Sequence, residues 1–140
     1  KMILHDHTVM GLGDGGAHVG TICDASFTTT MLAHWGRDRK RGGLIDLPTL
    51  VRCQTHDTAR AMGLGDRGLL VSGKRADINI IDFENLKVRS PEMVYDLPNG
   101  SPRVQQKADG YIATIVKGQV TYRNGEATES LPGRLIRGSR

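Results

Sequence analysis

The second half of the chain is dominated by short runs of β-branched residues separated by glycine-containing turns. The runs are Leu69–Ser72, Asp77–Asp82, Lys87–Val88, Tyr111–Lys117 and Gln119–Arg123. Three of them end in turn signals, at Gly73-Lys74, Lys117-Gly118 and Asn124-Gly125. Runs of this kind, joined by two-residue turns, favour antiparallel hairpins. We therefore expect a small sheet or β-sandwich after about residue 65, with 69–72 and 77–82 forming one hairpin.

Two of these runs, 78–81 and 112–116, show the alternation expected of strands that are covered mainly on one face. Large aliphatic residues recur in the β half, and each contributes about 1.5–3 kcal/mol when it is fully buried. The predicted core side chains are Leu70, Ile78, Ile80, Ile112, Ile115 and Val116.

The first half of the chain is predicted to be helical. Apolar residues over 25–35 follow helical spacing, and Asp24 or Ser26 is the expected N-cap. A second helical stretch begins near Pro48, which suits a first helical turn, and Gly63 provides its end. A break near Thr55 divides this stretch into two short helices.

Residues Met2 to Gly13 are predicted to form a strand, a turn and a second short strand that ends at Asp14. An acid at the tip of a strand, followed by Gly15 and Gly16, is how barrel enzymes present a metal ligand or a general base. The alternative is a simple Asp-Gly turn, in which the carboxylate bonds only to nearby backbone amides. His18 is a candidate substrate contact, or equally the first residue of a helix.

The sequence His5-Asp6-His7 places two imidazoles at the spacing that brings them to one face of a strand, which suits zinc. A polar turn near a strand start is the simpler interpretation, because no third ligand lies nearby in the sequence. We favour that interpretation.

The charge pattern argues against a nucleic-acid partner. The chain has a formal net charge of +4, and its one dense basic cluster, over 37–41, is interrupted by Asp38 and has no aromatic platform. Two separated cysteines, Cys23 and Cys53, suggest a reducing, cytoplasmic setting. No apolar run approaches the roughly 20 residues that cross a bilayer, so no membrane partner is expected.

The segment Asp66 to Asp82, with its Gly-Lys turn, Ala-Asp and apolar strand ending in an acid, resembles the C-terminal signature of the amidohydrolase superfamily. The segment Gly11 to His18 is similar to the eighth barrel strand of that family, whose terminal aspartate serves catalysis. The N-acyl-D-amino-acid deacylase (D-aminoacylase) branch is the nearest match. The motifs that carry it are Asp14-Gly15-Gly16-Ala17-His18, Asp66-Arg67-Gly68, Tyr95-Asp96-Leu97-Pro98-Asn99-Gly100, Gly110-Tyr111 and Pro132-Gly133-Arg134-Leu135.

The resemblance implies an α+β chain: the last strand and helices of a metal-dependent (β/α)8 barrel over 1–65, a β-sandwich over 66–128 and an extended tail over 129–140. It assigns Asp14 as the catalytic carboxylate with weak metal contact, and Gly15, Gly16 and His18 as substrate contacts. His5 and His7 precede the last strand, whereas the family's HxH motif lies on the first strand. A complete barrel takes about 250 residues, so we expect only the C-terminal portion of an enzyme here.

Three hypotheses follow. The first is a fragment of a zinc-dependent hydrolase of N-acyl amino acids, inactive alone and binding no metal alone. The second is a stand-alone structural or interaction domain derived from such an enzyme. The third is a small zinc protein that uses His5, His7, Asp14 and His18. Under the first hypothesis, the surface that would face the rest of the barrel is exposed. Homo-oligomers could form through that surface.

Overall fold

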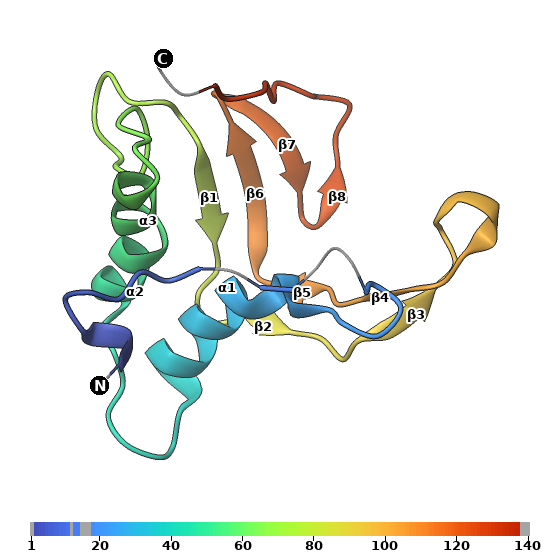
Figure 1. The fold of residues 1–140 in the computed structure, drawn as a ribbon, viewed down its shortest axis with the longest axis horizontal. Coiled ribbons are helices and arrows are strands. Elements are labelled where there is room, and N and C mark those ends of the chain that lie inside the picture. The colour runs from blue at the N-terminus through green and yellow to red at the C-terminus, as the bar shows by residue number, and fades with distance from the viewer. Residues whose placement is uncertain (1, 12, 15–17, 138–140) are drawn as a thin grey trace.

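The computed structural model describes residues 2–11, 13–14 and 18–137, and divides into a helical first half and a β second half (Figure 1). The chain is thus α+β, with helices beside antiparallel sheets, as expected from the sequence. The helical elements are η1 (Met2–Leu4), η2 (Asp24–Ser26), α1 (Phe27–Thr30), η3 (Met31–Asp38), α2 (Leu47–Gln54), α3 (His56–Ala61) and η4 (Pro98–Gly100). The strands are β1 (Ile78–Ile81), β2 (Lys87–Val88), β3 (Glu92–Val94), β4 (Arg103–Gln105), β5 (Ala108–Asp109), β6 (Tyr111–Val116), β7 (Gln119–Arg123) and β8 (Glu126–Ala127).

The first long helix confirms the prediction over 25–35 and runs one turn further, as α1 followed by the π-helical η3. Ser26, one of the two expected residues, is the N-cap of α1, but its side chain makes no capping hydrogen bond. Instead, the 3₁₀ turn η2 leads directly into α1, and the Phe27 N–H donates to the Asp24 carbonyl. The backbone therefore bonds where a capping side chain would otherwise be needed.

The second helical stretch is confirmed in detail. The Asp46 carboxylate caps α2 by accepting the Thr49 N–H at 2.9 Å, and a proline sits in the first turn. Thr55, at φ −123° and ψ −76°, breaks the stretch between α2 and α3. Gly63 follows at φ +69°, the left-handed conformation that ends helices.

The two strands predicted over residues 2–13 are wrong. Residues Met2–Leu4 form a 3₁₀ turn, and neither 5–11 nor 13–14 is in a strand. A barrel strand needs hydrogen-bonded neighbours on both sides. The strands in the described part of the chain pair with one another instead, so this segment has no partner of that kind.

The β half contains a four-stranded antiparallel sheet, β1-β6-β7-β8, and two smaller pairs, β2-β5 and β3-β4. The predicted turns at 117–118 and 124–125 join β6 to β7 and β7 to β8. All four turn residues have positive φ, between 49° and 83°, as hairpin turns of this type require.

The hairpin predicted from 69–72 and 77–82 is wrong. Residues 69–72 form no strand, and β1 pairs with β6, with Ile78 opposite Ile115. The Arg75 N–H donates to the Asp66 carbonyl at 2.7 Å, and the Lys74 ammonium donates to the Gly65 carbonyl. These bonds fold the segment back on the end of α3 rather than along β1.

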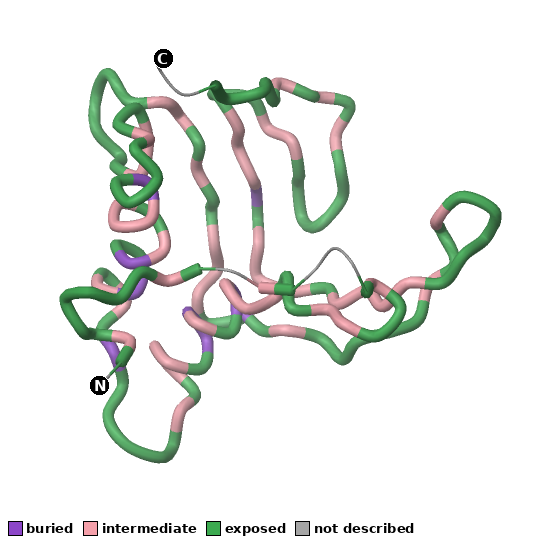
Figure 2. The backbone as a smooth tube through the Cα atoms, viewed as in Figure 1, coloured by how far each residue is buried: buried purple, intermediate pink, exposed green. Residues whose placement is uncertain are grey.

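The buried residues concentrate on the helices and where these meet the β half (Figure 2). One core cluster contains Leu32, Ala33, Ile45, Leu50 and Leu86, of which Leu50 and Leu86 are fully buried. Gly110 allows the close approach at this junction: it has φ +96°, and a Cβ there would lie 2.7 Å from the Leu86 Cα.

Half of the predicted core is wrong. Leu70, Ile80 and Ile112 are exposed by 82%, 46% and 45%, whereas Ile78, Ile115 and Val116 are half-buried. The sheet face expected to be covered has little packed against it, because the helices bury the β1–β2 connection instead. Beyond the sheet, residues 130–137 contain no helix or strand, and 138–140 lie outside the described residues.

Truncating the central core residue tests this placement. Leu50→Ala leaves a cavity where the helices meet Leu86, and is expected to cost about 2–5 kcal/mol of unfolding free energy in urea denaturation. Val51→Ala is the matched control, because Val51 is 44% exposed on the same helix. A cost at position 50 no larger than that at position 51 would contradict the assigned core.

Candidate functional site

Gly13 and Asp14 lie against the start of the first long helix. A Cβ at Gly13 would come within 2.7 Å of the Phe27 ring and 2.8 Å of the Asp24 carbonyl oxygen, so only glycine fits there. The Asp24 N–H donates to the Asp14 carbonyl at 3.3 Å. The backbone of Asp14 is therefore held by the helix start, while the residue itself is exposed.

A cleft of about 430 Å³ opens between this segment and the helix. Met10, Phe27 and Met31 give it an apolar part, and Ser26 and Gln106 bring polar groups to it. A cleft that combines apolar walls with a few polar groups is typical of small-molecule sites. Gly11 and Gly13 line it, which places it beside Asp14 in the chain.

The structure says less about the other predicted site residues, Gly15, Gly16 and His18. Gly15 and Gly16 lie outside the described residues. His18 is exposed, and its carbonyl accepts the N–H groups of Thr21 at 2.9 Å and Ile22 at 2.8 Å, which forms a turn. A substrate contact by the His18 imidazole stays a prediction.

His5 and His7 lie in a polar turn. The His7 N–H donates to Nδ1 of His5 at 3.2 Å, and the two ring centroids are 5.6 Å apart. Within 2–11, 13–14 and 18–137, no three His, Cys, Asp or Glu side chains come together as metal ligands. Since zinc sites take three or four protein ligands, the residues present do not fit a zinc site on their own, and the small-zinc-protein hypothesis lacks a site.

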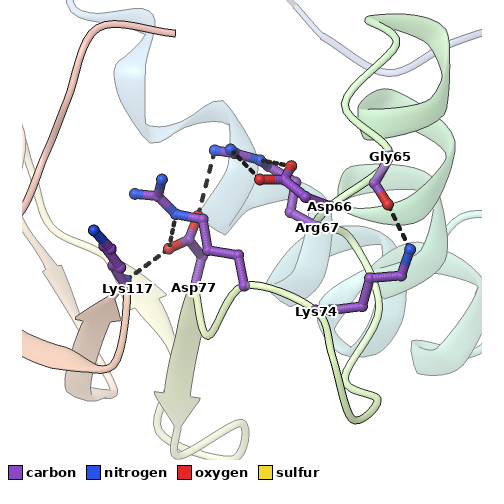
Figure 3. A network of polar contacts seen from close by, with 7 residues as sticks. Gly65, Asp66, Arg67, Lys74, Asp77 and Lys117 are labelled. Carbon is purple, nitrogen blue, oxygen red and sulfur yellow. Dashed lines mark hydrogen bonds and ion pairs between the residues drawn. The ribbon is translucent and has the colours of Figure 1, made fainter.

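Residues 65–77 include the first part of the signature segment Asp66 to Asp82. They form a network of hydrogen bonds and ion pairs (Figure 3). Arg67 makes two hydrogen bonds to Asp66, at 2.8 and 2.9 Å, and lies 3.5 Å from an Asp77 carboxylate oxygen. Asp77 also accepts from Arg75 at 2.8 Å and from the Lys117 N–H at 2.8 Å. The motif thus ties the end of the helices to the turn between β6 and β7.

The Asp77 carboxylate is held in its charged form. Partial burial pushes its pKa up, but the hydrogen bonds from Arg75 and Lys117 and the nearby charges of Arg75 and Arg67 outweigh that effect, so the pKa lies below its ordinary value. A group of this kind has a structural role: it stabilises the fold while it is ionised.

A larger cleft, which the sequence did not reveal, lies between the four-stranded sheet and the β2-β5 pair. It encloses about 930 Å³, with Asn79, Arg89, Asp109 and Tyr122 among its lining residues. Arg89 and Lys87 both form ion pairs with Asp109. The residues that line this cleft lie between positions 28 and 126, so no local sequence pattern predicts it.

The described part of the chain has no helix long and apolar enough to cross a membrane.

Sequence comparison identifies the family of this chain. The model of the amidohydrolase family matches residues 1–122, so the chain belongs to that family. Two relatives are both named dihydroorotase. One, from Elusimicrobium minutum, is 36% identical over 61% of this chain and 20% of its own length. The other, from Methanothermobacter thermautotrophicus, is 33% identical over 67% of this chain and 22% of its own length.

The chain thus spans about a fifth of the length of these curated relatives. No solved structure matches it significantly. These matches show the amidohydrolase family, but they do not single out the D-aminoacylase branch that the motifs suggested.

The Asp77 network makes a pH-dependent prediction. Asp77→Asn is expected to cost about 1–2 kcal/mol at pH 7, because it removes hydrogen bonds to a charged group. Since the folded pKa is depressed, this contribution is present above the unfolded pKa of about 3.9 and is lost as the pH falls through the folded value. Urea denaturation at pH 7 and pH 3 measures the change.

Asp57→Asn is the control, because its ion pair with Arg52 is exposed and such pairs contribute at most about 1 kcal/mol. An Asp77→Asn cost that is the same at both pH values would show that the charge of Asp77 does not stabilise the fold.

Proposed function

We propose that this chain is the C-terminal portion of a metal-dependent amidohydrolase, and that Asp14 supplies its catalytic carboxylate. The observation that carries the proposal is the position of Asp14: exposed at the end of an apolar segment, beside a cleft, with its backbone held by the following helix. Membership of the amidohydrolase family over residues 1–122 supports this assignment.

The proposed role of Asp14 is proton transfer. Hydrolysis of an amide requires a water molecule to lose a proton as it attacks the carbonyl carbon, and the leaving nitrogen to gain one. A carboxylate within hydrogen-bond reach of both can accept the first proton and deliver the second. Solvent exposure and a backbone held by Asp24 suit Asp14 to this role, and its neighbour Gly13 lines the cleft.

Zinc is the metal that we propose for the whole enzyme. Asp14 offers one weak ligand, and among the described residues no group of three or more potential metal ligands forms. We therefore place the remaining ligands in a part of the enzyme outside these 140 residues, and expect this chain to bind no metal alone.

For the substrate we propose an N-acyl amino acid, with the D-series suggested by the five motifs that resemble D-aminoacylases. A dihydroorotase activity is the second candidate, since both reported relatives carry that name. Assaying the full-length enzyme in parallel on N-acetyl-D-amino acids, their L-isomers and dihydroorotate distinguishes the two.

We further propose that residues 1–65 complete a (β/α)8 barrel, that 66–128 form a β-sandwich beside it and that 129–140 are a tail laid over both. The absence of strand pairing at residues 2–11 and 13–14 is consistent with a barrel strand separated from its neighbours. Large exposed side chains such as Leu70, Leu131 and Leu135, exposed by 82%, 92% and 77%, are consistent with surfaces that the rest of the enzyme covers.

The isolated chain is accordingly expected to self-associate. Sedimentation equilibrium over a hundredfold concentration range should give an average mass that rises well above 15.3 kDa, because exposed apolar surface favours association. A monomer at every concentration would instead support the alternative of a stand-alone structural or interaction domain. Leu131→Asp together with Leu135→Asp should weaken the association.

Replacing the carboxylate tests the catalytic assignment. In the full-length enzyme, Asp14→Asn is expected to lower kcat by about 100-fold or more while leaving the fold intact, because general acid–base groups contribute about 10²–10⁴. Asp6→Asn, an exposed acid in the same segment, is the control and should keep its activity. Near-normal turnover of Asp14→Asn would contradict the assignment.

A further inference from the structure

The β half contacts the segment that follows Asp14 at two points. The Val104 N–H on β4 donates to the Val19 carbonyl at 2.6 Å. One residue beyond that strand, the Gln106 amide oxygen accepts a hydrogen bond from the Ser26 hydroxyl. These bonds join positions about 80 residues apart, so they are tertiary contacts and not part of a local turn.

Gln106 is itself anchored within the β half. Its amide nitrogen donates to the Arg89 carbonyl at 2.9 Å. Both ends of its amide are therefore engaged, one with the β half and one with the helix start. The side chain also lines the 430 Å³ cleft together with Gly11 and Gly13, which precede Asp14.

Two contacts connect the residues around Ser26 to the backbone at Asp14. Ser26 is the last residue of the 3₁₀ turn η2, whose first residue, Asp24, donates its N–H to the Asp14 carbonyl. Phe27, the next residue after Ser26, fills the space that a Cβ of Gly13 would need. A shift of η2 therefore moves the backbone on which the Asp14 carboxylate stands.

We propose that Gln106 is a positioning residue for the Asp14 carboxylate, acting through the Ser26 hydroxyl and η2. This inference rests on the proposed catalytic role of Asp14. It gives the β half a part in catalysis beyond support of the barrel, because a displacement of about 1 Å at a reacting group can cost about 100-fold in rate.

The test uses the full-length enzyme and the substrate that it hydrolyses best in the parallel assays. Gln106→Met keeps the length of the side chain but removes both hydrogen bonds. It is expected to lower kcat about tenfold with KM changed less than about twofold, because only the reacting geometry is disturbed. Gln105→Met is the matched control: it changes the neighbouring residue, which lines the other, larger cleft, and should leave kcat unchanged.

Ser26→Ala removes the same hydrogen bond from the opposite side, so it keeps the test open if Gln106→Met folds poorly. It should reproduce the fall in kcat, and the double variant should be no slower than the slower single variant, since both act on one interaction. The folded fraction of each variant is measured by circular dichroism, so that kcat refers to folded enzyme.

The possible failures are distinguishable. If Asp14→Asn loses activity but Gln106→Met and Ser26→Ala keep a normal kcat, the positioning role is wrong and the proposed function stands. If Asp14→Asn retains its activity, the proposed function itself fails. Additive losses in the double variant would also overturn the coupling through Ser26.

Discussion

The fold depends on the burial of Leu50 and Leu86 in one core, because this cluster joins the helical half to the β half. Leu86 lies in the connection between β1 and β2, and it enters the core beside Leu32 and Ile45. Arg37 completes the junction by donating to the carbonyls of Phe83, Glu84 and Leu86. The hydroxyls of Thr29 and Tyr111 add a hydrogen bond of 2.8 Å between α1 and β6.

Local sequence signals predicted the local structure well. Pro48 and Gly63 marked the second helical stretch, since residues that start and end helices act within a few positions. The turns at 117–118 and 124–125 formed hairpins because only a few residue types adopt positive φ readily. The pairing of β1 with β6, some 35 residues apart, had no such local signal. Leu70 was misassigned for the same reason: its burial depended on a strand that the Asp66 and Lys74 contacts prevent.

The candidate site was predictable only in part. The glycine-rich context of Asp14 was sufficient to single it out, and Gly13 fits the helix start in a way that explains the glycine there. His5 and His7 make the polar turn that the sequence favoured over a zinc site. Gln106 could not be found from the sequence, because its proposed role rests on a contact with Ser26 that exists only in the folded chain.

The central claim is that this amidohydrolase chain carries a catalytic carboxylate but not a metal centre of its own. Native mass spectrometry of the isolated chain with one equivalent of zinc measures this directly. The account predicts a metal-free chain of 15.3 kDa and its simple oligomers. Stoichiometric zinc on the isolated chain would contradict it, because His5, His7 and Asp14 would then have to build a site that the fold does not bring together.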